Sequence, residues 1–290
     1  MHTNLIIENI SKNSLTIDML RLDLVHPIIS GNKWFKLKYY LEEAASKKVK
    51  TIASFGGPYS NHIVALAHAA KINNLKSIGY IRSNAGESIT PSIQQAIDAG
   101  MDIRYLGRTN FQENKEKLLQ NKHSQSEIYF VDEGGYGALG AKGISELFSL
   151  LPLAKYDYIV CAVGTGTMLA GLINGSAEHQ NIIGIPVLKN EESIADEIRH
   201  LLIDPDKKFQ VLHEFHQGGY AKTTPSQIQY MNQFWEQTNI PTDIVYTGKL
   251  VFAVHQLVQQ KYFKENSSLL MIHSGGLQGN RSLKKGVLQF

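Results

Sequence analysis

A run rich in glycine and threonine is the first feature of this sequence that points to chemistry: Gly164-Thr165-Gly166-Thr167. It follows the apolar run 158–163, which predicts a buried strand, and it opens a predicted helix. Glycines let backbone N–H groups point inward, threonines add hydroxyl donors, and a helix N-terminus favours an anion. The run therefore predicts a phosphate site, and the alternative is a tight strand-to-helix turn that binds nothing.

Two familiar nucleotide signatures do not fit this run. No Gly-Lys-Ser/Thr follows it, so it is not a Walker loop. Leu169 stands where the third glycine of a dinucleotide fingerprint would be. A nucleotide-dependent oxidoreductase is therefore disfavoured.

A second run of this kind is Gly56-Gly57-Pro58-Tyr59-Ser60-Asn61-His62. A strand end, two glycines and three polar side chains open a helix there. This predicts a second anion site, suited to a carboxylate, with the hydroxyl of Ser60 poised beside it. Helix capping by Ser60 or Asn61 is the alternative, and the two roles are compatible.

Lysines and histidines offer further candidates. Gly31-Asn32-Lys33 precedes the helical run 34–45, and we expect helical spacing to point Lys36 and Lys38 away from Lys33. A lysine in such a place is by itself usually just solvated. The nearest approach to a metal cluster, His213-Glu214-x-His216, is one residue short of a zincin helix, so we expect no metal. No Gly-x-Ser-x-Gly elbow supports a hydrolase triad.

The elements that position these runs alternate as strand, loop and helix. This order predicts an α/β protein with mostly parallel sheet, in which ligands bind at the carboxyl ends of the strands. The predicted strands are 51–55, 77–81, 102–106, 127–131, 158–163, 182–187, 210–213 and 269–272. The predicted helices are 34–45, 61–71, 91–98, 111–119 and 141–151, with another after 167.

Composition excludes several classes. The chain has 290 residues, 43% of them hydrophobic, which is enough apolar surface to exclude disorder as the main state. Its longest apolar runs are about six residues, far below the roughly 20 of a membrane span. Cys161 is the single cysteine and cannot form an internal disulfide, and residues 1–10 show no signal-peptide pattern. A net charge of +3 does not argue for nucleic acid, and we expect a cytoplasmic protein.

Six motifs together resemble one family, that of 1-aminocyclopropane-1-carboxylate (ACC) deaminase and D-cysteine desulfhydrase. Its members are pyridoxal-phosphate (PLP) enzymes with the tryptophan-synthase-β fold, fold type II. The resemblance runs from about Leu20 onward, and the N-terminus is shorter than usual. In order, the motifs are Ser30-Gly31-Asn32-Lys33-Trp34-Phe35-Lys36-Leu37-Lys38-Tyr39, the 56–62 run, Glu133-Gly134-Gly135, the 164–167 run, Val245-Tyr246-Thr247-Gly248-Lys249 and His273-Ser274-Gly275-Gly276.

The resemblance implies two domains, each an open, mostly parallel twisted sheet flanked by helices. A large PLP-binding domain would comprise residues 1–35 and 142–290, and a smaller inserted α/β domain residues 36–141. It also implies residue roles. Lys33 would bind PLP covalently and then act as general base at the substrate Cα. The cofactor phosphate would bind to Gly164, Thr165, Gly166 and Thr167, and the 3′-oxygen of its ring to Asn61. The substrate carboxylate would bind to Ser60, Asn61 and His62. Tyr220 and Tyr246 would be the two active-site tyrosines.

Two positions separate the activities of the family. Thr247 would face the pyridine nitrogen, where the ACC-deaminase branch has a glutamate, and Ser274 stands where that branch has a leucine. A threonine hydroxyl offers no negative charge, so the ring would be a weaker electron sink. A weaker sink suits β-elimination better than the opening of an unactivated cyclopropane.

The sequence thus predicts a PLP lyase that converts D-cysteine to pyruvate, ammonia and hydrogen sulfide, with Ser274 in the substrate pocket. ACC deaminase, giving 2-oxobutanoate and ammonia, is the alternative. A non-catalytic protein that binds PLP or a phosphometabolite is a third hypothesis. The expected partners are a small amino-acid substrate and a second copy of the chain in a homodimer, with no membrane.

Overall fold

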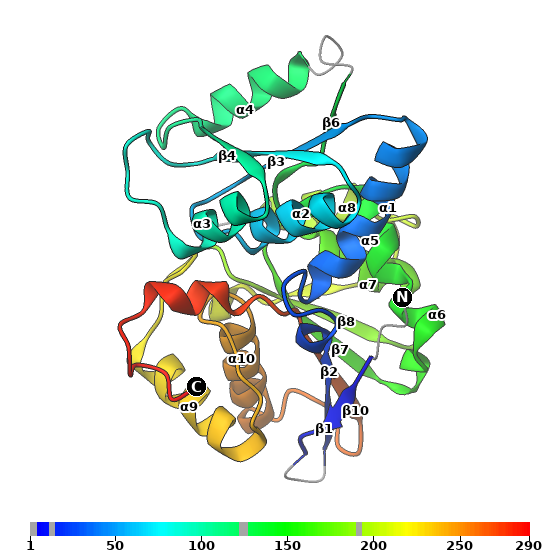
Figure 1. Cartoon of the computed structure of the whole chain (residues 1–290). Helices are drawn as coiled ribbons and strands as arrows, with labels where there is room; N and C mark the ends of the chain where they lie inside the picture. Colours follow the sequence, from blue (N-terminus) through cyan, green and yellow to red (C-terminus); the bar gives the residue numbers. More distant parts are fainter. Residues whose placement is uncertain (1–4, 12–14, 122–126, 190–192) are drawn as a thin grey trace.

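The computed structural model describes residues 5–11, 15–121, 127–189 and 193–290, and it contains two sheets with helices packed against them (Figure 1). The larger sheet has the order β1-β2-β10-β7-β8-β9, and only β1 runs antiparallel to its neighbour. Its strands are β1 (Ile7–Asn9), β2 (Thr16–Arg21), β10 (Ser268–His273), β7 (Tyr158–Val163), β8 (Asn181–Pro186) and β9 (Gln210–Val211). The predicted α/β class with mostly parallel sheets is confirmed.

The smaller sheet has the order β5-β4-β3-β6 and is wholly parallel. Its strands are β5 (Met101–Tyr105), β4 (Lys76–Ile81), β3 (Thr51–Gly56) and β6 (Ile128–Phe130). All four come from one stretch of chain, and the larger sheet takes its strands from either side of that stretch. The domain boundaries at 35/36 and 141/142 stay a prediction.

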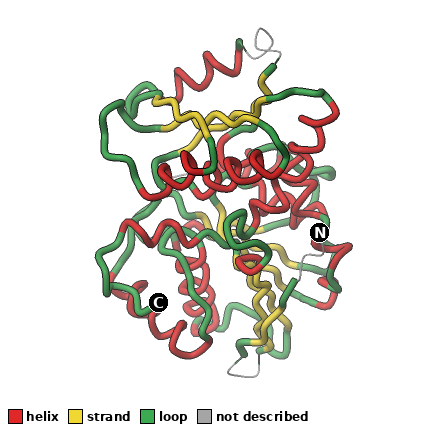
Figure 2. The backbone as a smooth tube through the Cα atoms, in the orientation of Figure 1, coloured by secondary structure: helices red, strands yellow, loops and turns green. Residues whose placement is uncertain are grey.

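The helices fill the space between and around the sheets, as Figure 2 shows for the layer between the two sets of strands. They are α1 (Asn32–Ser46), α2 (Asn61–Ile72), α3 (Pro91–Asp98), α4 (Phe111–Gln120), α5 (Ala138–Ser145), α6 (Leu147–Leu150), α7 (Thr167–Gly175), α8 (Ile194–Arg199), α9 (Pro225–Thr238) and α10 (Thr247–Gln259). Within the described ranges, none is long and apolar enough to cross a membrane.

Strand β7 lies in the middle of the larger sheet, and this position explains why its sequence is an unbroken apolar run. Ile159, Cys161 and Val163 pack into the hydrophobic core on one face. Tyr158, Val160 and Ala162 pack into the core on the other face. Because successive side chains of a strand point to opposite faces, a strand covered on both sides has to be apolar at every position.

Two predicted elements differ from the structure. The helix predicted over 141–151 is two short helices, α5, which begins earlier at Ala138, and α6. Pro152 restrains Leu151 to the extended conformation that ends α6. The strand predicted over 210–213 covers only Gln210–Val211, and His213 starts a 3-10 turn. The sequence analysis did not predict β1, β2, α8, α9 or α10.

Glycines let α5 lie very close to the two helices that carry the site. A Cβ at Gly143 of α5 would stand 2.0 Å from the backbone oxygen of Phe35 in α1. A Cβ at Gly171 of α7 would stand 2.5 Å from the backbone oxygen of Ala141 in α5. Glycine is therefore required at both contacts, which fix the spacing of α1 and α7.

Candidate active site

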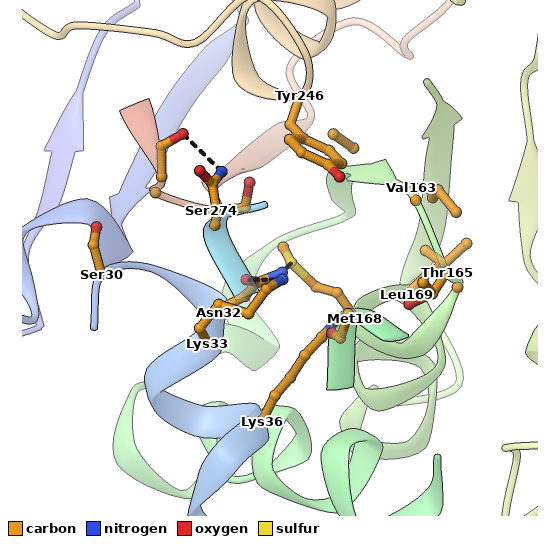
Figure 3. A pocket seen from close by; sticks show the side chains of 17 residues that line it. Ser30, Asn32, Lys33, Lys36, Val163, Thr165, Met168, Leu169, Tyr246 and Ser274 are labelled. Carbon is orange, nitrogen blue, oxygen red and sulfur yellow. Dashed lines mark hydrogen bonds between the residues drawn. The ribbon is translucent and has the colours of Figure 1, made fainter. Parts of the chain in front are cut away.

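The first turn of α1 contacts the loop after β10. Gly31 has φ +70°, and a Cβ there would lie 1.7 Å from the backbone oxygen of Ser274, so the contact requires glycine. The backbone N–H of Asn32 donates to the same oxygen at 3.0 Å. Two motifs at opposite ends of the sequence are thereby joined, and Lys33 and Ser274 line one cavity (Figure 3).

The amine of Lys33 is largely removed from water. Its Nζ donates to Oδ1 of Asn32 at 3.1 Å, and burial lowers its pKa to about 8. A buried site disfavours the charged form of an amine, so a larger fraction is neutral near neutral pH. A neutral amine is the form that attacks a carbonyl and accepts a proton.

Lys36 enters the same cavity, so the expectation that helical spacing points it elsewhere is wrong. Residues three apart on a helix share a face. Lys36 is 3% exposed, extends from α1 toward Met168 in Figure 3, and its Nζ lies 3.4 Å from the carbonyl oxygen of Gly134. Burial, followed by the charge of Lys33, holds its pKa well below the ordinary value. Lys38 does point away, and its ammonium pairs with Glu146.

The 164–167 run forms the opposite wall of the cavity. Gly166 has φ +80° and caps α7, and Thr165 and Thr167 hydrogen-bond through their hydroxyls at 3.2 Å. Thr167 is fully buried, whereas Gly164, Thr165 and Gly166 line the cavity. Hydroxyls, glycine backbone and a helix N-terminus, on the same cavity as the amine of Lys36, form a site that suits a phosphate.

The predicted carboxylate-binding run opens α2. The Oγ of Ser60 accepts from the N–H of Ile63 at 3.3 Å, so the capping role is confirmed, while its own hydrogen stays available to a ligand. Asn61 donates from Nδ2 to the carbonyl of Gly276 at 2.9 Å, and its buried Oδ1 has no hydrogen-bond partner in the described structure. A buried amide oxygen without a partner is costly, so it marks a place where a ligand donor fits.

His62 is buried and turned toward the smaller sheet. Its Nε2 lies 2.8 Å from Oγ of Ser54 in β3, and its buried Nδ1 has no partner among the described residues. Burial, then the charges of Lys33 and Lys36, hold its pKa well below the usual value, which favours the neutral ring. His62 also lines the larger cleft beside the cavity.

That larger cleft has a volume of about 570 Å³ and carries both predicted tyrosines. The rings of Tyr220 and Tyr246 meet edge to face, with their centroids 6.3 Å apart. Burial, followed by the neighbouring Tyr220, raises the pKa of Tyr246 well above its usual value. Both phenols therefore stay protonated at neutral pH and are proton donors to whatever occupies the cleft.

Thr247 and Ser274 lie in different surroundings. Thr247 is fully buried, and its Oγ1 donates to Oδ1 of Asp243 at 2.8 Å and accepts from the N–H of Asp243 at 2.7 Å. It is absent from the linings of the cavity and the cleft, whereas Ser274 lines the cavity. The predicted contact of Thr247 with a ring nitrogen stays a prediction.

The structure gathers most of the predicted residues and adds one. Lys33, Asn61, Gly164, Thr165, Gly166, Tyr246 and Ser274 line the cavity, and Ser60, His62 and Tyr220 join several of them around the cleft. Lys36 is the added residue, and its i+3 spacing from Lys33 was the signal that could have found it. The described residues contain no group of three His, Cys, Asp or Glu that could hold a metal ion.

Pyridoxal phosphate fits this set of groups. Its aldehyde would meet the amine of Lys33, and its phosphate the 164–167 run and Lys36. Oδ1 of Asn61 is an acceptor available to the hydroxyl of its ring.

The comparisons with known proteins agree with this chemistry. A family model described as pyridoxal-phosphate dependent enzyme matches residues 13–275. A putative ACC deaminase of Thermotoga maritima is 28% identical and covers 92% of this chain and 91% of its own length. The bifunctional D-cysteine desulfhydrase/ACC deaminase of Arabidopsis thaliana is 25% identical over 92% of this chain and 74% of its own.

The solved structures extend the likeness to the fold. The crystal structure of an ACC deaminase homologue superposes with a TM-score of 0.81 at 25% identity, covering 91% of this chain and 86% of that one. An O-ureido-L-serine synthase superposes with a TM-score of 0.72 at 11% identity, covering 98% and 92%, which shows a shared fold alone.

Proposed function

This chain belongs to the family of pyridoxal-phosphate dependent enzymes, and we propose that it is a lyase acting on a small D-amino acid with a leaving group at Cβ. The proposed substrate is D-cysteine. With one water consumed, the products are pyruvate, ammonia and hydrogen sulfide. The proposal includes a cytoplasmic homodimer, which sedimentation and cell fractionation would test.

The lysine and the two anion sites define the roles of the chain's own residues. The cofactor supplies an electron sink for the charge that develops at the substrate Cα. Lys33, with a pKa of about 8, is neutral in a useful fraction of molecules and would accept the Cα proton at Nζ. The hydroxyl of Ser60 and the N-terminus of α2 would hold the substrate carboxylate, which fixes the Cα–H bond relative to Nζ.

The leaving group needs a proton donor, and the tyrosine pair supplies one. Tyr220 and Tyr246 line the cleft next to Lys33, and both phenols are protonated at neutral pH. A thiolate leaving from Cβ would take a proton from one of them as the bond breaks. Removal of either hydroxyl is therefore expected to lower kcat more than it weakens substrate binding.

One observation supports D-cysteine over ACC. Among the described residues that line the cavity there is no aspartate or glutamate, whereas Asp132 and Glu133 line the adjoining cleft, and small polar Ser274 stands on the cavity wall. A cavity without a carboxylate would not hold extra negative charge near the cofactor ring. Such a weak sink favours a substrate whose own leaving group takes the electrons.

The alternative is ACC deaminase, and the names of the relatives favour it. Proteins of Thermotoga maritima and Pyrococcus abyssi, each 28% identical to this chain, are both named putative ACC deaminases. In that case 2-oxobutanoate and ammonia would be the products.

A turnover panel decides between the two. The purified protein, loaded with PLP, is given D-cysteine, L-cysteine, β-chloro-D-alanine, D-serine and ACC in turn. We expect pyruvate from D-cysteine and β-chloro-D-alanine, and no product with Lys33→Ala. If 2-oxobutanoate forms from ACC at least as fast as pyruvate from D-cysteine, the alternative becomes the function. No turnover of any substrate would leave the non-catalytic hypothesis.

A further inference from the structure

We propose that Lys249 is a positioning residue: its ammonium group binds three backbone carbonyls and so holds the segment 213–221, with Tyr220, against the active-site cleft. The inference rests on the proposed function only for the role given to Tyr220. Lys249 belongs to the motif Val245-Tyr246-Thr247-Gly248-Lys249, and the site described above assigns it no role.

The contacts of Lys249 match the shape of an ammonium group. Its side chain is 0% exposed, and Nζ donates to the carbonyl oxygens of His216 at 2.8 Å, Gly219 at 2.5 Å and Val187 at 3.3 Å. An ammonium group has three hydrogens, and three acceptors receive them. Lys249 thus connects α10, the end of β8 and the segment 213–221.

This ammonium has no carboxylate in direct contact among the described residues. Burial lowers its pKa to about 8, and the charge of Asp243 acts against that shift from a distance. Removing a cation from water is expensive unless its hydrogen bonds are replaced. The three carbonyls are the replacement, so the position of the segment and the burial of the lysine depend on each other.

The segment itself adopts an unfavourable backbone conformation. Gln217 and Ala221 have φ of 52° and 55°, in the left-handed region, and they flank Gly218 and Gly219, with φ of 92° and 112°. Each non-glycine residue in that region costs about 1 kcal/mol. Such conformations persist where the surroundings impose them.

Few contacts with the rest of the molecule impose this backbone conformation on the segment 213–221. Phe215 is buried in the core and anchors the start of the segment. The hydrogen bonds from Gly218 to Nδ1 of His216 and from Thr224 to Gln217 are local. Among the described residues, Lys249 is therefore the contact that, beside the Tyr220–Tyr246 ring pair, ties the middle of the segment to the end of β8 and to α10.

The consequence concerns the tyrosine pair. Tyr220 directly follows Gly219, whose carbonyl is bound by Lys249, and Tyr246 immediately precedes α10, where Lys249 is the third residue. Lys249 thus ties the residue before Tyr220 to the helix start that Tyr246 precedes in the chain. Its loss would let Tyr220, already 43% exposed, leave the cleft.

Hydrogen–deuterium exchange of the full-length, PLP-loaded protein tests the holding role. In Lys249→Met, we expect peptides covering 213–222 to exchange at least tenfold faster, with β7 peptides unchanged. Lys249→Gln keeps two donors and should fall between Met and wild type, and it remains informative if Lys249→Met does not fold. Lys222→Met, on the exposed part of the same loop, should exchange like wild type. Unchanged exchange in both Lys249 variants, or an equal increase in β7, would overturn the proposal.

Kinetics then test the role of Tyr220. With D-cysteine, Lys249→Gln should lower kcat at least tenfold while the absorbance of the bound cofactor is unchanged. Adding Tyr220→Phe to Lys249→Gln should cause little further loss, because both changes remove the same phenol from the cleft. Full additivity would show that Lys249 does not act through Tyr220. If the chain does not turn over D-cysteine, the proposed function fails, and the exchange result still decides the role of Lys249.

Discussion

The amine of Lys33 should make the stability of the cofactor-free protein depend on pH. Its pKa is about 8 in the folded chain and 10.5 in a solvated one. Between these values the unfolded chain binds the proton and the folded chain releases it. The unfolded state thus binds more protons, so the free energy of unfolding rises with pH across this window. In Lys33→Met this contribution disappears.

The two pKa values set the size of the effect. A lysine that titrates at 8 when folded and at 10.5 when unfolded adds about 2 kcal/mol to the free energy of unfolding between pH 7 and 9.5. Lys249 also has a pKa of about 8, so it should add a similar pH-dependent change to the free energy of unfolding of both wild type and Lys33→Met. The difference between wild type and Lys33→Met therefore reports Lys33 together with its effect on the pKa values of Lys36 and His62, which burial and then the charge of Lys33 lower. At pH 7 the variant should be more stable by up to about 3 kcal/mol.

Urea unfolding of the cofactor-free proteins at pH 7, 8, 9 and 9.5 measures the difference. Stopping there avoids tyrosines such as Tyr40 and Tyr230, whose pKa values burial raises to about 12. The gap between Lys33→Met and wild type should shrink by about 2 kcal/mol over the range. Lys50→Met, on the exposed turn before β3, is the matched control and should run parallel to wild type. Parallel curves for Lys33→Met would refute the argument.

Substitutions at four further positions probe the walls of the site and its supports. Gly166→Val should weaken PLP binding at least tenfold by fluorescence titration, because φ is +80° and its Cβ would lie 2.7 Å from Ile198; wild-type affinity would contradict this. Lys36→Met should lower the affinity for PLP by roughly 10- to 100-fold while leaving that for pyridoxal, which has no phosphate, unchanged; an equal loss for both would show that the lysine does not bind phosphate. Gly143→Ala should lower the free energy of unfolding by about 2 kcal/mol in urea, since its Cβ meets backbone; no loss would mean that the helices separate freely. Ser274→Leu should reduce kcat/KM for D-cysteine while Ser274→Ala changes it little, and the reverse order would make the hydroxyl, not the space, decisive.

Local patterns predicted the elements that carry the first half of the site. Strands β3, β4 and β7 and helices α2 and α3 lie within a residue or two of their predicted bounds. Apolar runs that stop at glycine and polar residues mark the carboxyl ends of parallel strands, and that is a local property. The C-terminal helices were not predicted. Helix α9 has many polar residues, which weaken its helical pattern. Helix α10 does have a clear helical period, in Leu250, Val254 and Leu257, and it was overlooked.

The site was predicted less completely, because side-chain direction and long-range contacts are not local. Lys36 was misplaced by an error about helical faces, which the i+3 rule corrects. Thr247 was predicted to face the pyridine nitrogen, but the sequence could not show that Asp243 already binds its hydroxyl. The same holds for Lys249, whose three carbonyls lie 30, 33 and 62 residues away in the chain.

These contacts explain why glycines and lysines dominate motifs that are scattered along the sequence. At Gly31 the absent side chain lets the carbonyl of Ser274 reach the N–H of Asn32, which places the loop after β10 beside Lys33. At Lys249 a long side chain does the opposite and reaches three distant carbonyls, two of which also accept from a local backbone N–H. Both devices join backbone segments that are distant in sequence, and both act on the segments that carry reactive side chains. The reactive groups therefore depend on backbone contacts that a list of catalytic residue types would omit.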